Sequence, residues 1–185
     1  AGLLTDMLPY LRRQSRSSLA TVDLASYLTV AFTAEFFAGV SIDDRSPEER
    51  KEWVATLLMP YRRSDGGWAK STNSGLSSTY HTFLALGCLE LADLAVPEPQ
   101  RVADMIRQRQ ASDGGFVDLP VLRESGTNTT AAALAVLYDL DALNDPTRQR
   151  ACDFLRTMQR RDGGFAAAAN KRRPLLHQVG RLRTS

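Results

Sequence analysis

Two histidines and two cysteines are the side chains of this 185-residue sequence best suited to acid–base or zinc chemistry. His81 has the most defined setting, in the run Thr79-Tyr80-His81-Thr82 at the start of a long apolar segment. An imidazole can act as a zinc ligand or as a general base near neutral pH. Cys88 follows on the same segment, roughly 10 Å along a helix, which is too far for one zinc ion to bind both side chains. The sequence therefore places an imidazole at a helix start without a complete ligand set beside it.

The elements that must position His81 repeat along the chain. The tetrapeptide aspartate-glycine-glycine-aromatic occurs at 65–68, 113–116 and 162–165, so that the copies begin 48 and 49 residues apart. Glycine tolerates a positive φ, and the pair therefore allows a tight reversal of the chain. We expect the aspartate to bind amides of this turn, and the aromatic ring (Trp68 or Phe116 in the first two copies) to fill the gap between units.

Two kinds of helix flank each turn. The segment 47–60 has apolar residues at i, i+3 and i+4, which marks one buried stripe, and it begins with a capping box at Ser46 and with Pro47 at the first helical position. The segments 80–95 and 128–142 are apolar nearly all round, which predicts burial on every side. The pattern predicts an all-α protein of helix hairpins, with buried inner helices and amphipathic outer helices stacked as a curved solenoid.

The chain is interpreted as one domain over 1–185. Its units are approximately 17–68, 69–116 and 117–165, and 166–185 is a partial unit or a basic tail. We expect the inner helix of the first unit over Thr29–Gly39. Asp145 and Pro146 repeat the cap and the proline at the start of the third outer helix, and Pro97 or Pro99 supplies the proline of the second.

The motif Gln-x-x-Asp-Gly-Gly-aromatic, at this spacing and before an Ala- and Leu-rich helix, resembles the repeat of protein prenyltransferase β-subunits and squalene-type terpene cyclases. The resemblance covers about residues 28–170. It implies an α/α toroid, in which inner and outer helices enclose an apolar cavity that holds an isoprenoid chain. A closed toroid of that family has about six helix pairs, so three to four repeats imply an incomplete or degenerate member.

The stretch from Tyr80 to Leu89 is similar to the one that carries the histidine ligand of the catalytic zinc in prenyltransferases. This similarity implies catalytic roles for His81 and Tyr80. The other ligands of that zinc form an Asp-x-Cys pattern one repeat earlier, which falls on Thr29 and Ala31 here. Neither residue supplies a carboxylate or a thiolate, so we expect no metal or other cofactor to be held by this chain alone.

The resemblance also indicates where a substrate would bind. Inner helices run parallel in such a stack, so their N-terminal ends gather on one rim, where free amides and the helix dipole attract an anion such as diphosphate. The side chains expected to line an apolar face below this rim are Leu84, Ala85, Cys88, Ala132, Ala133 and Val136. We expect an isoprenoid diphosphate to bind there, and its expected binding residues are Lys70, Arg123, Thr129, Trp68 and Phe116.

Three functions stay open at this point. The first is a prenyltransferase-like transferase whose zinc site is missing or is completed by an α-subunit-like partner. The second is a non-catalytic helical repeat scaffold for protein–protein interaction. The third is a terpene cyclase-like fragment, although Asp139-Leu140-Asp141-Ala142 lacks the Asp-x-Asp-Asp acid of class II cyclases.

Composition restricts the partners. Apolar and charged residues make up 43% and 24% of the chain, as in ordinary soluble proteins, and we expect a cytoplasmic protein. The longest apolar stretch, Leu19–Val40, is interrupted by Asp23 and Glu35, so no membrane span is expected. The basic residues after Arg160 have no interleaved aromatic residues for base stacking, so nucleic acid is not an expected partner. An exposed inner face would favour a homodimer.

Overall fold

The structure, a computed structural model, describes residues 19–39 and 45–168. In this part of the chain the helical elements are α2 (Thr21–Ala38), α3 (Pro47–Leu58), η1 (Met59–Tyr61), α4 (Thr79–Leu91), α5 (Pro99–Arg107), α6 (Thr127–Asp139) and α7 (Asp145–Met158). Extended segments within these ranges meet only as isolated bridges, such as Arg62 with Trp68. The expected all-α fold of helix hairpins is confirmed, whereas the expectations for the start of the first unit and for the basic tail from residue 169 lie outside the described residues.

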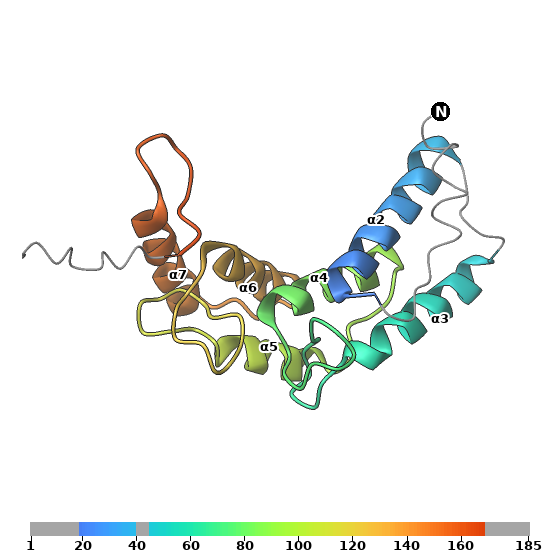
Figure 1. Ribbon diagram of the computed structural model, residues 1–185, viewed down its shortest axis with the longest axis horizontal. Helices are drawn as coiled ribbons and strands as arrows, with labels where there is room; N and C mark the ends of the chain where they lie inside the picture. Colours follow the sequence, from blue (N-terminus) through green and yellow to red (C-terminus); the bar gives the residue numbers. More distant parts are fainter. Residues whose placement is uncertain (1–18, 40–44, 169–185) are drawn as a thin grey trace, which may run out of the picture.

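The helices form two layers that follow an arc (Figure 1). α4 lies between α2 and α6, so these three inner helices form one layer in chain order. α3 packs against α4, while α5 and α7 pack against α6, which places the amphipathic helices outside. Leu28, Val54, Ile106 and Val136 are fully buried in this core, and burying one such side chain stabilises a fold by about 1.5–3 kcal/mol. Among the described helices, none has a stretch long and apolar enough to cross a membrane.

The first inner helix begins earlier than the sequence indicated. α2 starts at Thr21 rather than Thr29, and it has 18 residues where α4 has 13. The hydroxyl of Thr21 bonds to a carbonyl 48 residues further on, whereas the hydroxyls of Thr79 and Thr127 bond to carbonyls 38 and 39 residues further on. The first unit is therefore ten residues longer than the second. The expected start at Thr29 was wrong because the spacing of the turns does not extend to this unit.

The predicted cap of α3 and the predicted first proline of α5 are found in the structure, whereas the cap of α7 differs. The Ser46 hydroxyl accepts the Glu49 N–H at 3.2 Å, and the Glu49 carboxylate accepts the Ser46 N–H at 2.8 Å, which is the predicted capping box. Pro99 is the first residue of α5. In α7 the cap is Asn144, whose side chain accepts the amide three residues on, and Asp145 is already helical. The expected cap at Asp145 is corrected, because the N-cap side chain must reach the amides of the first turn from outside the helix.

The three Gly-Gly turns are built alike. In each turn the aspartate Oδ1 accepts the N–H of the second glycine at 3.0 Å. The first glycine of the first turn, Gly66, has a φ of +93°, a conformation that L side chains rarely adopt. Trp68 and Phe116 are 2% and 0% exposed, whereas Phe165 is 50% exposed. The aspartate binds turn amides as predicted, and the first two rings fill the gaps between units.

A threonine at the start of each inner helix joins its unit to the next one. The threonine N–H donates to a carbonyl of the next loop at 2.9–3.0 Å, and the hydroxyl donates to the carbonyl one residue earlier. The N–H pairs are Thr21 with Lys70, Thr79 with Asp118 and Thr127 with Ala167. These bonds define which residues of neighbouring units lie at the same level of the stack.

Candidate active site

His81 lies half-buried in the first turn of α4, against the N-cap residue of that helix. Its Nδ1 is 2.8 Å from Ser78 Oγ, and Ser78 Oγ also accepts the His81 backbone N–H at 3.1 Å. On its other side, Ser78 Oγ is 2.7 Å from Asp118 Oδ1. Ser78 itself is 1% exposed. Three side chains from two units thus form a hydrogen-bonded chain, Asp118–Ser78–His81.

This chain fixes the tautomer of His81. A carboxylate only accepts hydrogen bonds, so the single hydroxyl proton of Ser78 points to Asp118. Ser78 Oγ then offers only a lone pair to the imidazole, and Nδ1 must carry the proton. The Nε2 atom keeps its lone pair, and the described residues provide no hydrogen-bond donor to it. The imidazole is therefore arranged as an acceptor.

Burial lowers the pKa of the His81 imidazole below its usual value of 6.5. The Asp118 carboxylate opposes this effect, and the charge of Lys70 lowers the pKa further. The neutral ring is favoured at neutral pH as a result, so Nε2 is available to accept a proton or a hydrogen bond.

Tyr80 and Lys70 lie at the same end of α4. Tyr80 is 37% exposed, and its ring meets the His81 ring edge-on with 5.7 Å between centroids. The Tyr80 N–H donates to Asp118 Oδ1 at 3.0 Å, so this carboxylate takes an amide that an anion would otherwise bind. Lys70 is exposed and occupies the level of Asp118 one unit earlier. A cation and a carboxylate thus occupy equivalent positions at successive junctions.

The other two polar residues expected at the rim have different surroundings. Thr129 is half-buried in the first turn of α6, at the level that His81 occupies on α4. Arg123 is exposed and lines a hollow of about 310 Å³ with Met105 and Arg109, which belong to the end of the second outer helix and the residues after it. The hydrogen bonds of the described residues connect neither Thr129 nor Arg123 to His81.

Most of the apolar residues expected at the site are core residues. Trp68 and Phe116 are buried between units, and this placement supports packing rather than contact with a ligand. The buried members of the expected apolar face are Ala85, Cys88, Ala132, Ala133 and Val136. That part of the expectation was wrong, because these small side chains pack within the two helix layers.

A different stripe of α4 is open to solvent. Tyr80, Leu84, Gly87 and Leu91 follow at i, i+4, i+7 and i+11, which is one face of a helix. Tyr80 and Leu91 are 37% and 43% exposed, and the two residues between them are half-exposed. A Cβ atom built on Gly87 meets nothing within 4 Å. The inner layer therefore presents an apolar stripe that starts beside His81 and has free space above its middle.

The sequence did not reveal Ser78 and Asp118 as site residues. Ser78 could have been found, since it stands three residues before His81, which is the spacing of an N-cap. Asp118 lies 40 residues from Ser78, and only the stacking of units brings them together. Its one sequence signal is its position two residues after Phe116, in the connection between a turn and an inner helix.

A buried arginine supports the backbone at Asp118. Arg109 is 4% exposed, and its guanidinium donates to the Ser77 carbonyl at 3.0 Å and to the Asp118 carbonyl. The equivalent residues four positions before the repeated aspartates are Tyr61 and Met158. Because three different residue types occupy this position, the repeat pattern gave no signal for it.

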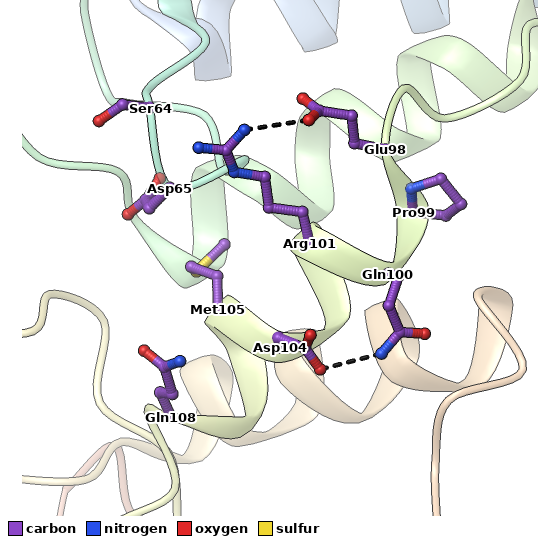
Figure 2. A pocket seen from close by; sticks show the side chains of 9 residues that line it. All are labelled: Ser64, Asp65, Glu98, Pro99, Gln100, Arg101, Asp104, Met105 and Gln108. Atoms are coloured by element: carbon purple, nitrogen blue, oxygen red, sulfur yellow. Dashed lines mark hydrogen bonds and ion pairs between the residues drawn. The ribbon is translucent and has the colours of Figure 1, made fainter.

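A larger hollow lies on the outer layer. This space of about 580 Å³ lies between the turn at residues 64–65 and α5. Figure 2 shows the side chains that line it. Arg101 donates to Glu98 at 3.0 Å and Gln100 donates to Asp104 at 2.9 Å, so its polar side chains bond to one another. None of the residues that line it belongs to an inner helix. It offers nothing that the chemistry of His81 could use.

The aspartates that were considered as the acid of a cyclase lie near the C-terminal ends of the inner helices, at the opposite edge from His81. Asp139 is the last residue of α6, and it lines a hollow of about 610 Å³ with Glu90 and Asp93 near the C-terminal end of α4. His81 lies in the first turn of α4, so the length of an inner helix separates the two edges. The structure therefore does not bring these carboxylates to the imidazole.

The donors near His81 do not fit a zinc ion, which takes four ligands in proteins and prefers thiolate, imidazole or carboxylate. Thr29 and Ala31 lie in the third turn of α2, and the residue at the level of His81 is Asp23. Burial raises the pKa of the Cys88 thiol to about 12, so it is not a thiolate at neutral pH. Within 19–39 and 45–168, no three His, Cys, Asp or Glu side chains group as a metal site.

Comparison with known proteins agrees with the architecture. No curated protein matches the chain. The family model of the prenyltransferase alpha-alpha toroid domain matches residues 8–172, a range that includes all three Gly-Gly turns and all the described helices. This match covers most of the sequence. The chain therefore belongs to the prenyltransferase alpha-alpha toroid domain family.

Proposed function

We propose that the inner layer binds an isoprenoid diphosphate, with its hydrocarbon chain along the exposed stripe of α4 and its polar end near His81. The observation that carries the proposal is the continuity of the two features. Tyr80 starts the stripe, which continues through Leu84 and Gly87 to Leu91 and contains no charged side chain. A linear hydrocarbon needs such an uninterrupted apolar path, because each buried CH₂ contributes about 0.8 kcal/mol.

The charged end of the ligand belongs between α4 and its neighbours. Asp118 already occupies the Tyr80 amide, so the start of α4 is less favourable for a diphosphate than the sequence implied. Lys70 provides an exposed cation on one side. On the other side the N-cap of α6 is Gly126, which makes no side-chain cap, and Thr129 follows in the first turn. His81 Nε2 adds an acceptor for a hydroxyl or amine of a second substrate.

Prenyl transfer is the finer part of this proposal. The family resemblance supports it, but the ligand set for zinc is incomplete in the described residues. Transfer would therefore require donors from a partner chain, such as an α-subunit-like protein. Without such a partner, we propose that the chain binds the isoprenoid and does not transfer it.

Calorimetry with farnesyl and geranylgeranyl diphosphate tests the binding. The blocking variant is Gly87→Trp, because a side chain at this position enters free space and does not disturb the core. Its matched control is Gly87→Ala, which adds one methyl group and removes a helix-interior glycine, a gain of about 0.5–1 kcal/mol in stability. We expect the native chain and Gly87→Ala to bind, and Gly87→Trp to lose at least about tenfold in affinity, or about 1.4 kcal/mol.

A native chain that gives no heat at millimolar ligand contradicts the proposal, as does Gly87→Trp binding as tightly as Gly87→Ala. The second candidate function is a non-catalytic scaffold. The paired Asp118 and the incomplete ligand set favour it. Binding of a protein partner through the exposed stripe, blocked by Gly87→Trp but not by isoprenoid diphosphates, would support the scaffold instead.

A further inference from the structure

The second junction, where Thr79 bonds to Asp118, differs from the other two at three positions around His81. These positions are the N-cap of the inner helix, the residue two after the aromatic residue of the turn, and the residue four before the aspartate of the turn. The second junction has Ser78, Asp118 and Arg109 there, and their counterparts at the first and third junctions are Ala20 and Gly126, Lys70 and Ala167, and Tyr61 and Met158. Of the three junctions, the second is the one that combines a hydroxyl, a carboxylate and a guanidinium at these positions.

Arg109 is 4% exposed, and its two terminal nitrogens bond to both sides of this junction. Nη1 donates to the Ser77 carbonyl at 3.0 Å and also to the Asp118 carbonyl. Nη2 donates to Ser77 Oγ at 2.6 Å and lies 3.5 Å from Asp65 Oδ2. A guanidinium is a planar fork of fixed geometry, so it holds the groups that it bonds at a set separation. Arg109 therefore fixes the segment that carries Ser78 relative to the segment that carries Asp118.

The Ser77 carbonyl depends on this arginine. Ser77 and Ser78 are each 1% exposed, and the described residues supply no other hydrogen-bond donor to the Ser77 carbonyl. A buried carbonyl without a partner costs about as much free energy as a lost hydrogen bond. Without the guanidinium, the peptide group that joins Ser77 to Ser78 would turn toward another donor. The 2.7 Å hydrogen bond from the Ser78 hydroxyl to Asp118 would then lose its alignment.

We infer that Arg109 is a positioning residue for His81. It keeps Ser78 and Asp118 aligned, so that the hydroxyl proton goes to the carboxylate, the ring proton stays on Nδ1 and the Nε2 lone pair stays available. Arg109 acts through these two residues, since its own hydrogen bonds go to Ser77, Asp118 and Asp65. The inference rests on the proposed function in one respect, because it takes His81 as part of the ligand site. The state of the ring itself does not depend on any ligand.

Long-range proton–nitrogen spectra of the ligand-free protein above neutral pH test this role. The variant is Arg109→Met, which removes every donor of the side chain and introduces the residue type found at the equivalent position of the third unit. The matched control is Tyr61→Phe, because the Tyr61 hydroxyl donates to the Leu19 carbonyl, the counterpart of the Ser77 carbonyl at the first junction. We expect the ring proton of His81 to move from Nδ1 to Nε2 in most molecules of Arg109→Met and to stay on Nδ1 in Tyr61→Phe.

The double variant Arg109→Met with Asp118→Ala tests whether the arginine acts through the carboxylate. Asp118→Ala alone is expected to move the ring proton to Nε2, because the Ser78 hydroxyl then donates to the ring. Adding Arg109→Met should produce no further change in the His81 signals, which His81→Gln identifies by their loss. A further change of the tautomer in the double variant would mean that Arg109 reaches the ring by another route, and the inference would be wrong.

The native tautomer in Arg109→Met overturns the inference, as does the same proton shift in Tyr61→Phe, which would make it a general result of a weakened junction. Circular dichroism shows whether the helices are retained. If Arg109→Met loses them, Arg109→Gln replaces it with the same expected shift, because its amide is too short to reach both carbonyls. Since the spectra are recorded without ligand, they are separate from the calorimetry: a chain that binds no isoprenoid diphosphate can still show the shift, and a chain that binds one can still lack it.

Discussion

At the scale of single residues, the geometry around Ser78 decides what His81 can do. Ser78 has a single hydroxyl proton and two polar neighbours, and its hydroxyl donates a hydrogen bond to the Asp118 carboxylate at 2.7 Å. The imidazole is left with a protonated Nδ1 and an unprotonated Nε2, a state that suits a base or a hydrogen-bond acceptor. Asp118 thus determines the protonation state of Nε2, on the far side of the ring, through Ser78 and without contacting the imidazole.

Nuclear magnetic resonance can observe this tautomer directly, because the chain has only two histidines. In long-range proton–nitrogen spectra above neutral pH, we expect Nδ1 of His81 to carry the proton. Asp118→Ala removes the acceptor and frees the Ser78 hydroxyl to donate to the ring, so the proton is expected to move to Nε2. Asp118→Asn retains a carbonyl acceptor and is expected to keep the native tautomer. Identical spectra for the native chain and Asp118→Ala would show that the hydrogen-bonded chain does not control the ring.

The lowered pKa of His81 makes stability depend on pH in one direction. Since burial holds the folded-state pKa below 6.5, the unfolded chain binds the proton more readily than the folded chain. The free energy of unfolding should therefore be constant above about pH 6.5 and should fall as the pH drops below it toward the folded-state pKa. Urea unfolding between about pH 5 and pH 8 measures this dependence. We expect His81→Gln to lose that part of the slope; an unchanged slope would assign it to other groups.

At this scale, the sequence could predict only those site residues that lie close to one another along the chain. His81 and Tyr80 belong to one helical turn, and their place at the start of an inner helix was readable from the chain. Ser78 lies in the connection before α4 and Asp118 in the connection before α6, and only the hydrogen bond across the junction reveals that these two residues are neighbours. Periodicity indicates which residues occupy one face of a helix, but it does not show which side chain of the next unit meets them.

At the scale of elements, packing around the second glycine of each turn determines whether a larger side chain can replace it. Gly115 has no positive φ to explain its identity, but its Cβ would lie 2.6 Å from Ser125 Cβ and 2.9 Å from the Phe154 ring. Gly164 has the same place in the third turn, where a Cβ atom would meet one atom within 4 Å, the side-chain Oδ1 of Asp162 at 3.3 Å. The two positions therefore form a natural pair for comparison.

We expect Gly115→Ala to destabilise the fold by about 1–3 kcal/mol, because a methyl group must be accommodated in a filled junction. Gly164→Ala should change the free energy of unfolding by no more than about 0.5 kcal/mol, as substitutions at open positions usually do. Urea unfolding of the two variants beside the native chain, at a low protein concentration, measures both values. Equal losses at the two positions would mean that the turn itself, and not the packing helix, requires glycine.

The element boundaries show where sequence reasoning ends. The capping box at Ser46 was predicted correctly, because the signal lies within four residues. The start of α2 at Thr21 was missed, because a threonine there resembles any other until its bonds to Ala69 and Lys70 are known. Asn144 was overlooked in favour of Asp145 for a related reason, since both side chains are good caps and only the backbone decides between them.

At the scale of the whole molecule, stacking holds the units together. α4 contacts one inner helix on each side, and buried threonine hydroxyls connect each junction. The repeat of the turn was sufficient to predict this architecture and the family, because each unit must bury its faces against its neighbours. It was not sufficient to predict the face on which a ligand would bind. Ala85 and Val136 were expected at that face, but the small side chains that line inner helices also serve to pack them.

The bonds across each junction have a consequence for how such a chain can change length. From turn to inner helix the spacing is constant: Asp65 and Asp113 each meet a serine 12 residues on, and Trp68 and Phe116 each meet a threonine 14 residues on. The ten additional residues of the first unit all lie between the inner helix start and the turn. Insertions should thus be tolerated at the edge where inner helices end, as in the connection at 140–144. One residue added between Phe116 and Asp118 would instead shift Asp118 away from Ser78 and uncouple the imidazole from its carboxylate.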